Sequence, residues 1–355
     1  MKLLIMAGGT GGHVYPALAV ADYLRERGHQ VVWMGAPDSF ESRVVPPRGI
    51  PMQYVRVSGL RGKGVLKLLQ APLLLLRAIL QALSILRRER PDAVLGMGGF
   101  ASGPGGIAAW LLRRPLVVHE QNAAAGLTNR WLARLARCVL EAFPGTFPHA
   151  QTVGNPVRAG FADVPPPAQR LDHEGVPRLL VVGGSQGAKA LNEQVPRALA
   201  LLAPAQRPEV RHQGGRTLDV AQRAYAETGV DARVEAFIDD MPGALAWADL
   251  VVCRAGASTI AELSAAGTAA VLVPFPFAVD DHQTRNAEYL VRAGAAVLLP
   301  ERDATPTQLA ALLRELLGDR QRLHRMSEAA RSAAWAHATE QIADACLQFA
   351  DGEWA

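Results

Sequence analysis

Short apolar runs, glycine loops and apolar-periodic stretches alternate from the first residues of the chain. The run Leu3–Ala7 predicts a strand, the loop GGTGGH follows it, and an apolar-periodic stretch then continues to Arg27. Gly28 is suited to end that predicted helix, and the run Val31–Met34 predicts a second strand. Strand, tight loop, helix and strand form a βαβ unit, which requires a parallel sheet covered by helices.

The same alternation restarts in the second half of the chain. After the run VGNPVR, the consecutive prolines at 165–167 stiffen an extended segment and mark the exit from a first domain. A strand at Leu179–Val182, the loop GGSQGAK and a helix from about Leu191 then repeat the opening motif. Further strands are predicted at 93–95, 116–119, 233–238, 250–253, 270–273 and 296–299.

The pattern predicts an α/β protein with two Rossmann-like, doubly wound domains that face each other across a cleft. A chain of 355 residues is also too long for one compact core. We expect a first domain at 1–160, a second at 161–335, and a C-terminal helix at 336–355 that packs back on the first domain.

Glycine loops between strand and helix are suited to binding phosphate, because backbone N–H groups and the helix N-terminus can approach an anion. Three such loops occur, at 8–12, 96–106 and 183–187, although each could also be a simple tight turn. Neither GGTGGH nor GGSQGA matches the G-x-G-x-x-G of nicotinamide enzymes, and no Walker GK[ST] ending is present. We therefore expect phosphorylated substrates and no bound cofactor.

Metal-dependent sugar transfer usually needs an Asp-x-Asp pair, which this sequence lacks. Asp239–Asp240 and Asp280–Asp281 are adjacent, so we interpret them as solvated helix starts and expect no metal site. The three cysteines are scattered and fit neither a zinc site nor a disulfide framework, which favours a reducing cytoplasm. The start MKLLIMAGGT does not resemble a signal peptide, and no uncharged apolar run is long enough to span a membrane.

Basic charge is concentrated in the segment Arg56–Arg90, which carries eight basic residues and one acid, although the whole chain nets only +4. Because no nucleic-acid module accompanies it, the segment indicates an anionic membrane surface as partner and not nucleic acid. We expect Pro72 to break the apolar run here. The residues 73–86 are interpreted as a crossover helix buried on the sheet, and 65–69, flanked by Arg61, Lys63 and Lys67, as a lipid-facing turn.

The segment CRAGASTIAE follows the predicted strand at 250–253. Ser258 is suited to cap a helix, and Glu262, one turn further on, could accept two hydrogen bonds from ribose hydroxyls or act as a simple capping acid. Further along, His282 and Gln283 stand at the start of another predicted helix, where an imidazole and an amide suit sugar hydroxyls.

Nine motifs in order resemble the bacterial peptidoglycan N-acetylglucosaminyltransferases: GGTGGHVYP, SGLRGKG, GMGGFASGPG, HEQNA–GLTN, VGNPVR, VVGGSQGA, FIDDM, CRAGASTIAE and DHQTRNA. The match runs from Met6 to about Gly294 and so covers most of the chain. The resemblance implies the two-domain GT-B glycosyltransferase fold. It also implies inverting transfer of GlcNAc from UDP-GlcNAc to the C4 hydroxyl of undecaprenyl-diphosphoryl-MurNAc-pentapeptide, in peptidoglycan synthesis at the cytoplasmic face of the inner membrane.

Within this resemblance, the first domain takes the lipid-linked acceptor at the membrane and the second binds UDP-GlcNAc. The implied substrate contacts, matched motif by motif, are Thr10, Gly11, Gly12, Asn122, Arg158, Ser185, Ile238, Ala257, Ser258, Thr259, Ile260, Ala261, Glu262 and Gln283. The segment PFAVDDH, ending at His282, departs from the family, in which some relatives carry polar, basic residues there.

Inverting transfer needs a base for the acceptor hydroxyl and positive potential for the departing diphosphate. His13 is the first candidate base, because it follows a glycine loop and an imidazole takes up protons near neutral pH. Binding a phosphate or capping a helix remains an alternative role for His13, and Glu120 is the second candidate base. Backbone amides around Ser185 and Gln186 are expected to carry the leaving-group charge.

Two functions from other classes stay open at this point. A sugar-nucleotide epimerase could use the same two-domain plan and would need no lipid-facing apolar surface. A non-catalytic membrane scaffold would need no cleft residues, and consumption of UDP-GlcNAc would separate it from the enzymes.

Overall fold

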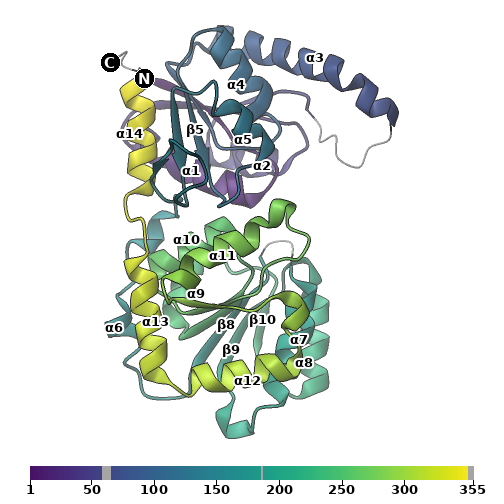
Figure 1. The fold of residues 1–355 in the computed structure, drawn as a ribbon, viewed down its shortest axis with the longest axis vertical. Coiled ribbons are helices and arrows are strands. Elements are labelled where there is room, and N and C mark those ends of the chain that lie inside the picture. The colour runs from purple at the N-terminus through teal and green to yellow at the C-terminus, as the bar shows by residue number, and fades with distance from the viewer. Residues whose placement is uncertain (58–64, 185–186, 351–355) are drawn as a thin grey trace. The chain divides into compact units, whose positions relative to one another are not determined.

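The structure, a computed structural model, describes residues 1–57, 65–184 and 187–350, and their side chains except for those of 65–69. It divides into two compact units (Figure 1), with Met1–Arg158 and His337–Ala355 in unit 1 and Ala159–Ala336 in unit 2. Each unit is a parallel sheet with helices on both faces, so the prediction of two doubly wound α/β domains is confirmed. The cleft between them stays a prediction.

Unit 1 has a seven-stranded sheet in the order β3-β2-β1-β4-β5-β6-β7. Its strands are β1 Lys2–Met6, β2 Gln30–Gly35, β3 Met52–Tyr54, β4 Ala93–Gly96, β5 Leu116–Glu120, β6 Cys138–Glu141 and β7 Gln151–Thr152. Its helices are α1 Gly11–Glu26, α2 Phe40–Val44, η1 Pro46–Arg48, α3 Val65–Glu89, α4 Ser102–Leu111, α5 Leu127–Leu132 and α14 Ala338–Ala350. Chain order reverses between β1 and β4, which is the switch point of the sheet.

The core of unit 1 lies on both faces of this sheet because side chains alternate along each strand. Leu3 and Ile5 of β1 join one buried cluster together with α1 and α14, whereas Leu4 and Met6 join a second cluster with α3 and α4. Helix α14 contributes Ile342, Ala343 and Cys346 to the first cluster, all fully buried. The C-terminal helix is thus part of the core of unit 1.

Helix α3 differs from the sequence expectation at two points. Pro72 does not break it, since α3 continues through this residue. A proline costs one helical hydrogen bond, and good helix formers continue on both sides of it. The expectation of a buried helix is also wrong for Leu73–Leu76, which are exposed, because only one stripe of α3 reaches the sheet. That stripe is formed by Ala78, Ala82, Ile85 and Leu86.

The segment Gln70–Glu89 of α3 is the one stretch of the described residues long and apolar enough to cross a membrane by length and composition. Its packing against the sheet identifies it instead as the crossover helix between β3 and β4. Figure 1 shows the first half of α3 projecting beyond the rest of unit 1. Arg61 and Lys63 lie outside the described residues, as does the side chain of Lys67.

Unit 2 has a six-stranded sheet in the order β10-β9-β8-β11-β12-β13, with its switch point between β8 and β11. Its strands are β8 Arg178–Val182, β9 Glu209–Gln213, β10 Arg233–Glu235, β11 Leu250–Cys253, β12 Ala270–Leu272 and β13 Ala296–Leu298. Its α-helices are α6 Pro167–Arg170, α7 Lys189–Ala200, α8 Leu218–Thr228, α9 Met241–Trp247, α10 Ala257–Ala266, α11 His282–Arg292, α12 Pro306–Leu317 and α13 Arg320–Ser332. Its 3₁₀ turns are η2 Ala159–Phe161, η3 Pro204–Gln206, η4 Gly215–Thr217, η5 Val279–Asp281 and η6 Glu301–Asp303.

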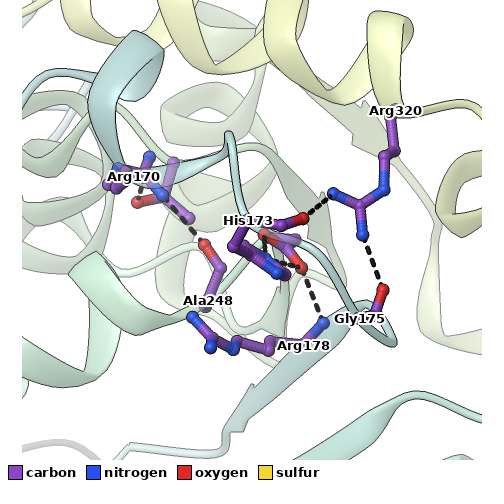
Figure 2. A network of polar contacts seen from close by, with 8 residues as sticks. Arg170, His173, Gly175, Arg178, Ala248 and Arg320 are labelled. Atoms are coloured by element: carbon purple, nitrogen blue, oxygen red, sulfur yellow. Dashed lines mark hydrogen bonds and ion pairs between the residues drawn. The ribbon is translucent and has the colours of Figure 1, made fainter.

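A polar network ties the entry segment of unit 2 to the amino-terminal edge of its sheet (Figure 2). The carboxylate of Asp249 accepts hydrogen bonds from His173 Nε2 (2.9 Å) and from the backbone N–H of Arg178 (2.7 Å). Arg320 donates to the carbonyl oxygens of His173 and Gly175, each at 2.6 Å. The network therefore lies at the end of the strands opposite the glycine loops.

Candidate functional site

In unit 1 the loops after β1 and β4 meet at the carboxyl ends of the strands, the usual ligand position in a doubly wound sheet. The N–H of Gly8 donates to the carbonyl of Gly98 (3.2 Å), and that of Met97 to Met6 (2.8 Å). Gly99 has φ +92°, and a Cβ there would lie 2.6 Å from the carbonyl oxygen of Gly8. Only glycine fits this approach, so two of the predicted phosphate loops form one continuous backbone surface.

Helix α1 begins directly after the first of these two loops. Thr10 is its N-cap residue in extended conformation, and its side chain makes no capping hydrogen bond. Gly11 and Gly12 are the first two helical residues, and the first turn contains no acidic residue. N–H groups at a helix start have no partner within the helix and attract anions, which suits the predicted contacts Thr10, Gly11 and Gly12.

Glu41 of α2 holds the first glycine loop, and the sequence analysis missed it. Its side chain is 2% exposed and accepts hydrogen bonds from the backbone N–H of Gly9 (3.0 Å) and Ala36 (3.1 Å). A Cβ at Gly8 would lie 2.5 Å from Glu41 Oε1. The loop thus rests on a buried carboxylate.

His13 follows in the first turn of α1 and is half-buried. Its Nδ1 lies 2.6 Å from Oε1 of Gln121, the residue between the predicted Glu120 and Asn122. The Nε2 of Gln121 lies 3.0 Å from Nδ1 of His119, and Nε2 of His119 lies 2.9 Å from the carbonyl oxygen of Gly154. Burial lowers the pKa of His119 to about 4. Gln121 and His119 were both absent from the predicted site.

Glu120 has an environment unlike that of an exposed base. It is 1% exposed, and its carboxylate accepts hydrogen bonds from the backbone N–H of Asn122 (3.0 Å) and Gly126 (3.1 Å). The side-chain amides of Asn122 (3.2 Å) and Asn129 (2.9 Å) donate to it as well. With four donors, the carboxylate organises the loop that carries Asn122. This favours His13 over Glu120 as the base.

Arg158, the last residue of unit 1, lies near the same helix. Its guanidinium carbon is 5.9 Å from the centroid of the Tyr15 ring, on the first half of α1, and Tyr15 in turn packs edge-on against Phe40 of α2. Unit 1 therefore gathers Thr10, Gly11, Gly12 and His13 at the start of α1, and Arg158 lies near Tyr15 of the same helix. Asn122 directly follows Gln121, which contacts His13.

In unit 2 the loop after β8 packs on the loop after β9. Gly187 has φ +78°, and a Cβ there would lie 2.6 Å from Thr217 Oγ1. Ser185, a predicted contact, and Gln186 lie outside the described residues. The loop after β9 is held by Asn192, fully buried on α7, whose Nδ2 donates to the carbonyls of Gly214 and Thr217, both at 2.9 Å.

A second histidine orients Asn192. His212 Nε2 lies 2.9 Å from Asn192 Oδ1, and His212 Nδ1 lies 3.0 Å from the hydroxyl of Tyr225. Burial lowers the pKa of His212 to about 3 and raises the pKa of Tyr225. The neutral imidazole can thus accept from the tyrosine and donate to the asparagine.

Helix α10 carries six predicted contacts after β11, and its start differs from the prediction. Its N-cap is Gly256, in extended conformation, so the expectation that Ser258 caps it is wrong. Ser258 is instead the second helical residue, and its buried Oγ has no hydrogen-bond partner among the described residues. The contacts on this helix are Ala257, Ser258, Thr259, Ile260, Ala261 and Glu262. A helix start without an acidic residue or a capping side chain suits a diphosphate.

The two remaining predicted contacts of unit 2 lie after β10 and in the first turn of α11. Ile238 is 3% exposed and follows β10. Gln283 is the second residue of α11, and its Oε1 accepts a hydrogen bond from the backbone N–H of Phe275 (2.9 Å). That bond leaves its amide nitrogen as the group that could donate to a sugar. His282 Nδ1 lies 2.8 Å from the carbonyl of Val279.

Arg254 joins three of these loops and was also missed. Its Nη1 donates to the carbonyls of Val273 and Pro274, both at 3.1 Å, and its Nη2 pairs with Glu301. The loops after β11, β12 and β13 are thereby tied together. Among the described residues, no group of three or more His, Cys, Asp or Glu side chains could hold a metal ion.

Two doubly wound parallel units, each with a glycine loop and an uncapped helix start at its switch point, suit phosphate-bearing substrates. The matching family models identify the class as a glycosyltransferase of the GT-B type. Residues 3–141 match the glycosyltransferase family 28 N-terminal domain, and residues 178–344 match the C-terminal domain of the same family. The chain belongs to glycosyltransferase family 28 and is a transferase.

Similar proteins cover its whole length. Proteins named UDP-N-acetylglucosamine–N-acetylmuramyl-(pentapeptide) pyrophosphoryl-undecaprenol N-acetylglucosamine transferase are 57% identical in both Marinobacter nauticus and Alkalilimnicola ehrlichii. These alignments cover 99% and 98% of this chain, and 98% and 99% of the relatives. The crystal structure of MurG from Acinetobacter baumannii is similar with a TM-score of 0.85 at 41% identity, covering 98% of this chain and 99% of that one.

Proposed function

We propose that this enzyme transfers N-acetylglucosamine from UDP-N-acetylglucosamine to the C4 hydroxyl of MurNAc in undecaprenyl-diphosphoryl-MurNAc-pentapeptide. The observation that carries the proposal is the 57% identity, over nearly the full length, to relatives named for this transfer. The arrangement of the described site residues supports it, because each unit offers a helix start suited to a phosphate group.

In the proposed reaction His13 takes the proton of the acceptor hydroxyl. The hydroxyl oxygen then forms a bond to the anomeric carbon while the bond from that carbon to the diphosphate oxygen breaks, so UDP leaves with the electron pair from the opposite face. The start of α10 and the backbone amides after β8 stabilise the charge that develops on the diphosphate. Glu262 holds the ribose hydroxyls, and Gln283 binds the sugar.

The proposed function is tested against the epimerase and scaffold alternatives by measuring whether consumption of UDP-GlcNAc depends on the acceptor. The purified chain is incubated with radiolabelled UDP-GlcNAc, with and without a short-prenyl analogue of the lipid-linked acceptor. We expect label in a lipid-linked disaccharide only when the acceptor is present. Conversion of UDP-GlcNAc into another sugar nucleotide without acceptor would indicate an epimerase, and no consumption under either condition would indicate a scaffold.

We further propose that unit 1 binds the anionic cytoplasmic face of the inner membrane through neighbouring helices α3, α4 and α5. Large apolar side chains on these helices are 48–70% exposed, namely Leu73, Leu75, Leu80, Trp110, Leu127 and Trp131. Exposed cations lie among them at Arg77, Arg113 and Arg134, and the Arg134 guanidinium carbon is 4.6 Å from the Trp131 ring centroid. Apolar area bordered by arginine suits an anionic lipid surface.

Sedimentation with anionic vesicles tests the membrane proposal. A Leu73→Asp, Leu80→Asp double variant should lose at least about ten-fold in vesicle affinity, because charged groups replace apolar area at the lipid surface. Turnover of a short-prenyl acceptor should stay within about two-fold. Leu201→Asp, at an exposed leucine of unit 2, is the matched control and should bind vesicles as wild type does. Equal binding by the double variant would place the membrane contact elsewhere.

A further inference from the structure

A chain of hydrogen bonds runs from a backbone carbonyl to the imidazole of His13. It passes from Gly154 through His119 and Gln121, with separations of 2.9, 3.0 and 2.6 Å between successive polar atoms. His119 and Gln121 are both fully buried. The proposed reaction has so far given them no role.

The donor in the first link is unambiguous. A carbonyl oxygen only accepts hydrogen bonds, so His119 Nε2 must carry the hydrogen that points at Gly154. Burial keeps His119 neutral, with its pKa lowered to about 4, and a neutral imidazole carries one N–H. Nδ1 of His119 is therefore an acceptor.

The orientation of the Gln121 amide follows from that acceptor. Only its NH₂ group can donate to His119 Nδ1 (3.0 Å), and the same group also lies 3.1 Å from the carbonyl of His119. The inverted amide would place an oxygen against two acceptors, which is unfavourable in a buried site. Oε1 of Gln121 therefore faces Nδ1 of His13 at 2.6 Å.

We propose that Gln121, oriented by His119, is a positioning residue that holds His13 as the Nδ1–H tautomer, so that the lone pair on Nε2 receives the proton of the acceptor hydroxyl. The inference rests on the proposed function, because it specifies which nitrogen of His13 reacts. On proton uptake Nε2 gains the hydrogen and Nδ1 keeps its own. The imidazolium then still donates to Gln121, whose oxygen stabilises the new charge.

The position of the imidazole ring is restricted as well. Gly98 has φ +95°, and a Cβ there would lie 3.0 Å from both Cε1 and Nδ1 of His13. The ring therefore lies against the backbone of the β4 loop on one side and meets Gln121 through Nδ1. Backbone contact and hydrogen bond together favour a single ring orientation, as a general base requires.

Nitrogen NMR of ¹⁵N-histidine-labelled full-length protein tests the tautomer directly. The signals of His13 are assigned by their loss in His13→Gln. At a pH at which His13 is neutral, we expect a proton-bearing Nδ1 and an unprotonated Nε2 in the wild type, and a mixture of tautomers in Gln121→Leu. An Nε2–H tautomer in the wild type would overturn the inference even if transfer is fully active.

The kinetic parameters kcat and KM distinguish a role of Gln121 in positioning His13 from a general loss of structure. Gln121→Leu should lower kcat by about 10–100-fold, the scale of a misoriented base, while KM for UDP-GlcNAc stays within about two-fold. His119→Leu should release the amide and shift the tautomer in the same direction, and the double variant should lose little more than Gln121→Leu. His173→Leu, which removes another half-buried histidine network, is the control and should leave the His13 signals unchanged.

Failure of the positioning role and failure of the proposed function give different results. An unchanged kcat in Gln121→Leu contradicts the positioning role. So does a fold-loss of kcat in the double variant that equals the product of the fold-losses in the two single variants. Absence of acceptor-dependent transfer by the wild type contradicts the proposed function instead, whatever tautomer the NMR signals show.

Discussion

At the scale of single residues, buried carboxylates hold the loops at the carboxyl edge of the first sheet. Glu41, Glu120 and Glu141 are each at most 2% exposed, and each accepts hydrogen bonds from backbone N–H groups of a loop. Glu141, for example, accepts from the backbone of Gly145 (2.9 Å) and Phe147 (2.8 Å). These acids fix loop backbones, which agrees with the proposal that His13 and not a carboxylate is the base.

Removing Glu41 should therefore loosen the first glycine loop. We expect Glu41→Ala to lower the free energy of unfolding by about 2–3 kcal/mol, because it leaves two backbone donors without their acceptor. Urea unfolding measures this change, and Glu26→Ala, at an exposed acid on α1, is the control. Equal stability of the two variants would show that the carboxylate does not support the loop.

Glu262 is the residue expected to accept hydrogen bonds from the ribose hydroxyls of the donor. Glu262→Ala should weaken binding of UDP-GlcNAc by about 2–4 kcal/mol, the scale of charge-assisted hydrogen bonds left unmade. Calorimetric titration with UDP-GlcNAc and its 2′-deoxyuridine analogue measures it. The two donors should bind the variant about equally. Strong discrimination against the deoxy donor by Glu262→Ala would assign the ribose contact to another side chain.

The sequence could point to His13, Thr10 and Glu262 because glycine loops and helix starts are local patterns. It could not point to Gln121 or Glu41, because their partners lie far away in the chain: Gln121 reaches His13 across 108 positions, and Glu41 reaches Gly9 across 32. Arg254 was missed for the same reason, since its carboxylate partner, Glu301, comes from a different loop.

At the scale of elements, most of the strands that were predicted are continuous apolar runs, as expected for parallel strands buried on both faces, and β10, which reads RVE, is the exception. Those that were missed are short or polar. Strand β9 reads EVRHQ and β7 has two residues, so neither shows an apolar run. Only the structure identifies them as strands, because β9 pairs with β8 and β7 pairs with β6.

Helix α14 is the element whose packing has the clearest consequence for stability. Ile342 is fully buried against α1, so Ile342→Ala should cost about 2–4 kcal/mol through lost burial and the cavity it leaves. Thermal unfolding measures this, and Gln341→Ala, at an exposed neighbour, should change little. If both substitutions are neutral, the C-terminal helix does not contribute to the core of unit 1.

At the scale of the whole molecule, each unit encloses a histidine that must stay neutral. The pKa values of His119 and His212 are lowered to about 4 and 3 in the folded protein. As the pH falls, these two histidines are therefore protonated in the unfolded chain before they are protonated in the folded one. Stability is thus full above about pH 6.5 and declines as the pH falls toward 4.

Between pH 7.5 and 5.5 the expected loss is about 1.4 kcal/mol per buried histidine. Urea unfolding at the two pH values measures it. His212→Leu should be less stable at pH 7.5 but lose less on acidification, whereas His149→Leu, at an exposed histidine, should keep the wild-type pH dependence. An identical pH dependence in His212→Leu would contradict the neutral, buried state of His212.

The structure of the reaction product tests the proposed transfer. The enzyme is supplied with UDP-GlcNAc and a short-prenyl MurNAc-pentapeptide diphosphate, and the disaccharide is analysed by NMR for its linkage and anomeric configuration. We expect a single GlcNAc joined in β configuration to C4 of MurNAc, and loss of this product in His13→Ala. An α-linked disaccharide, attachment at another hydroxyl, or undiminished product from His13→Ala would contradict this expectation.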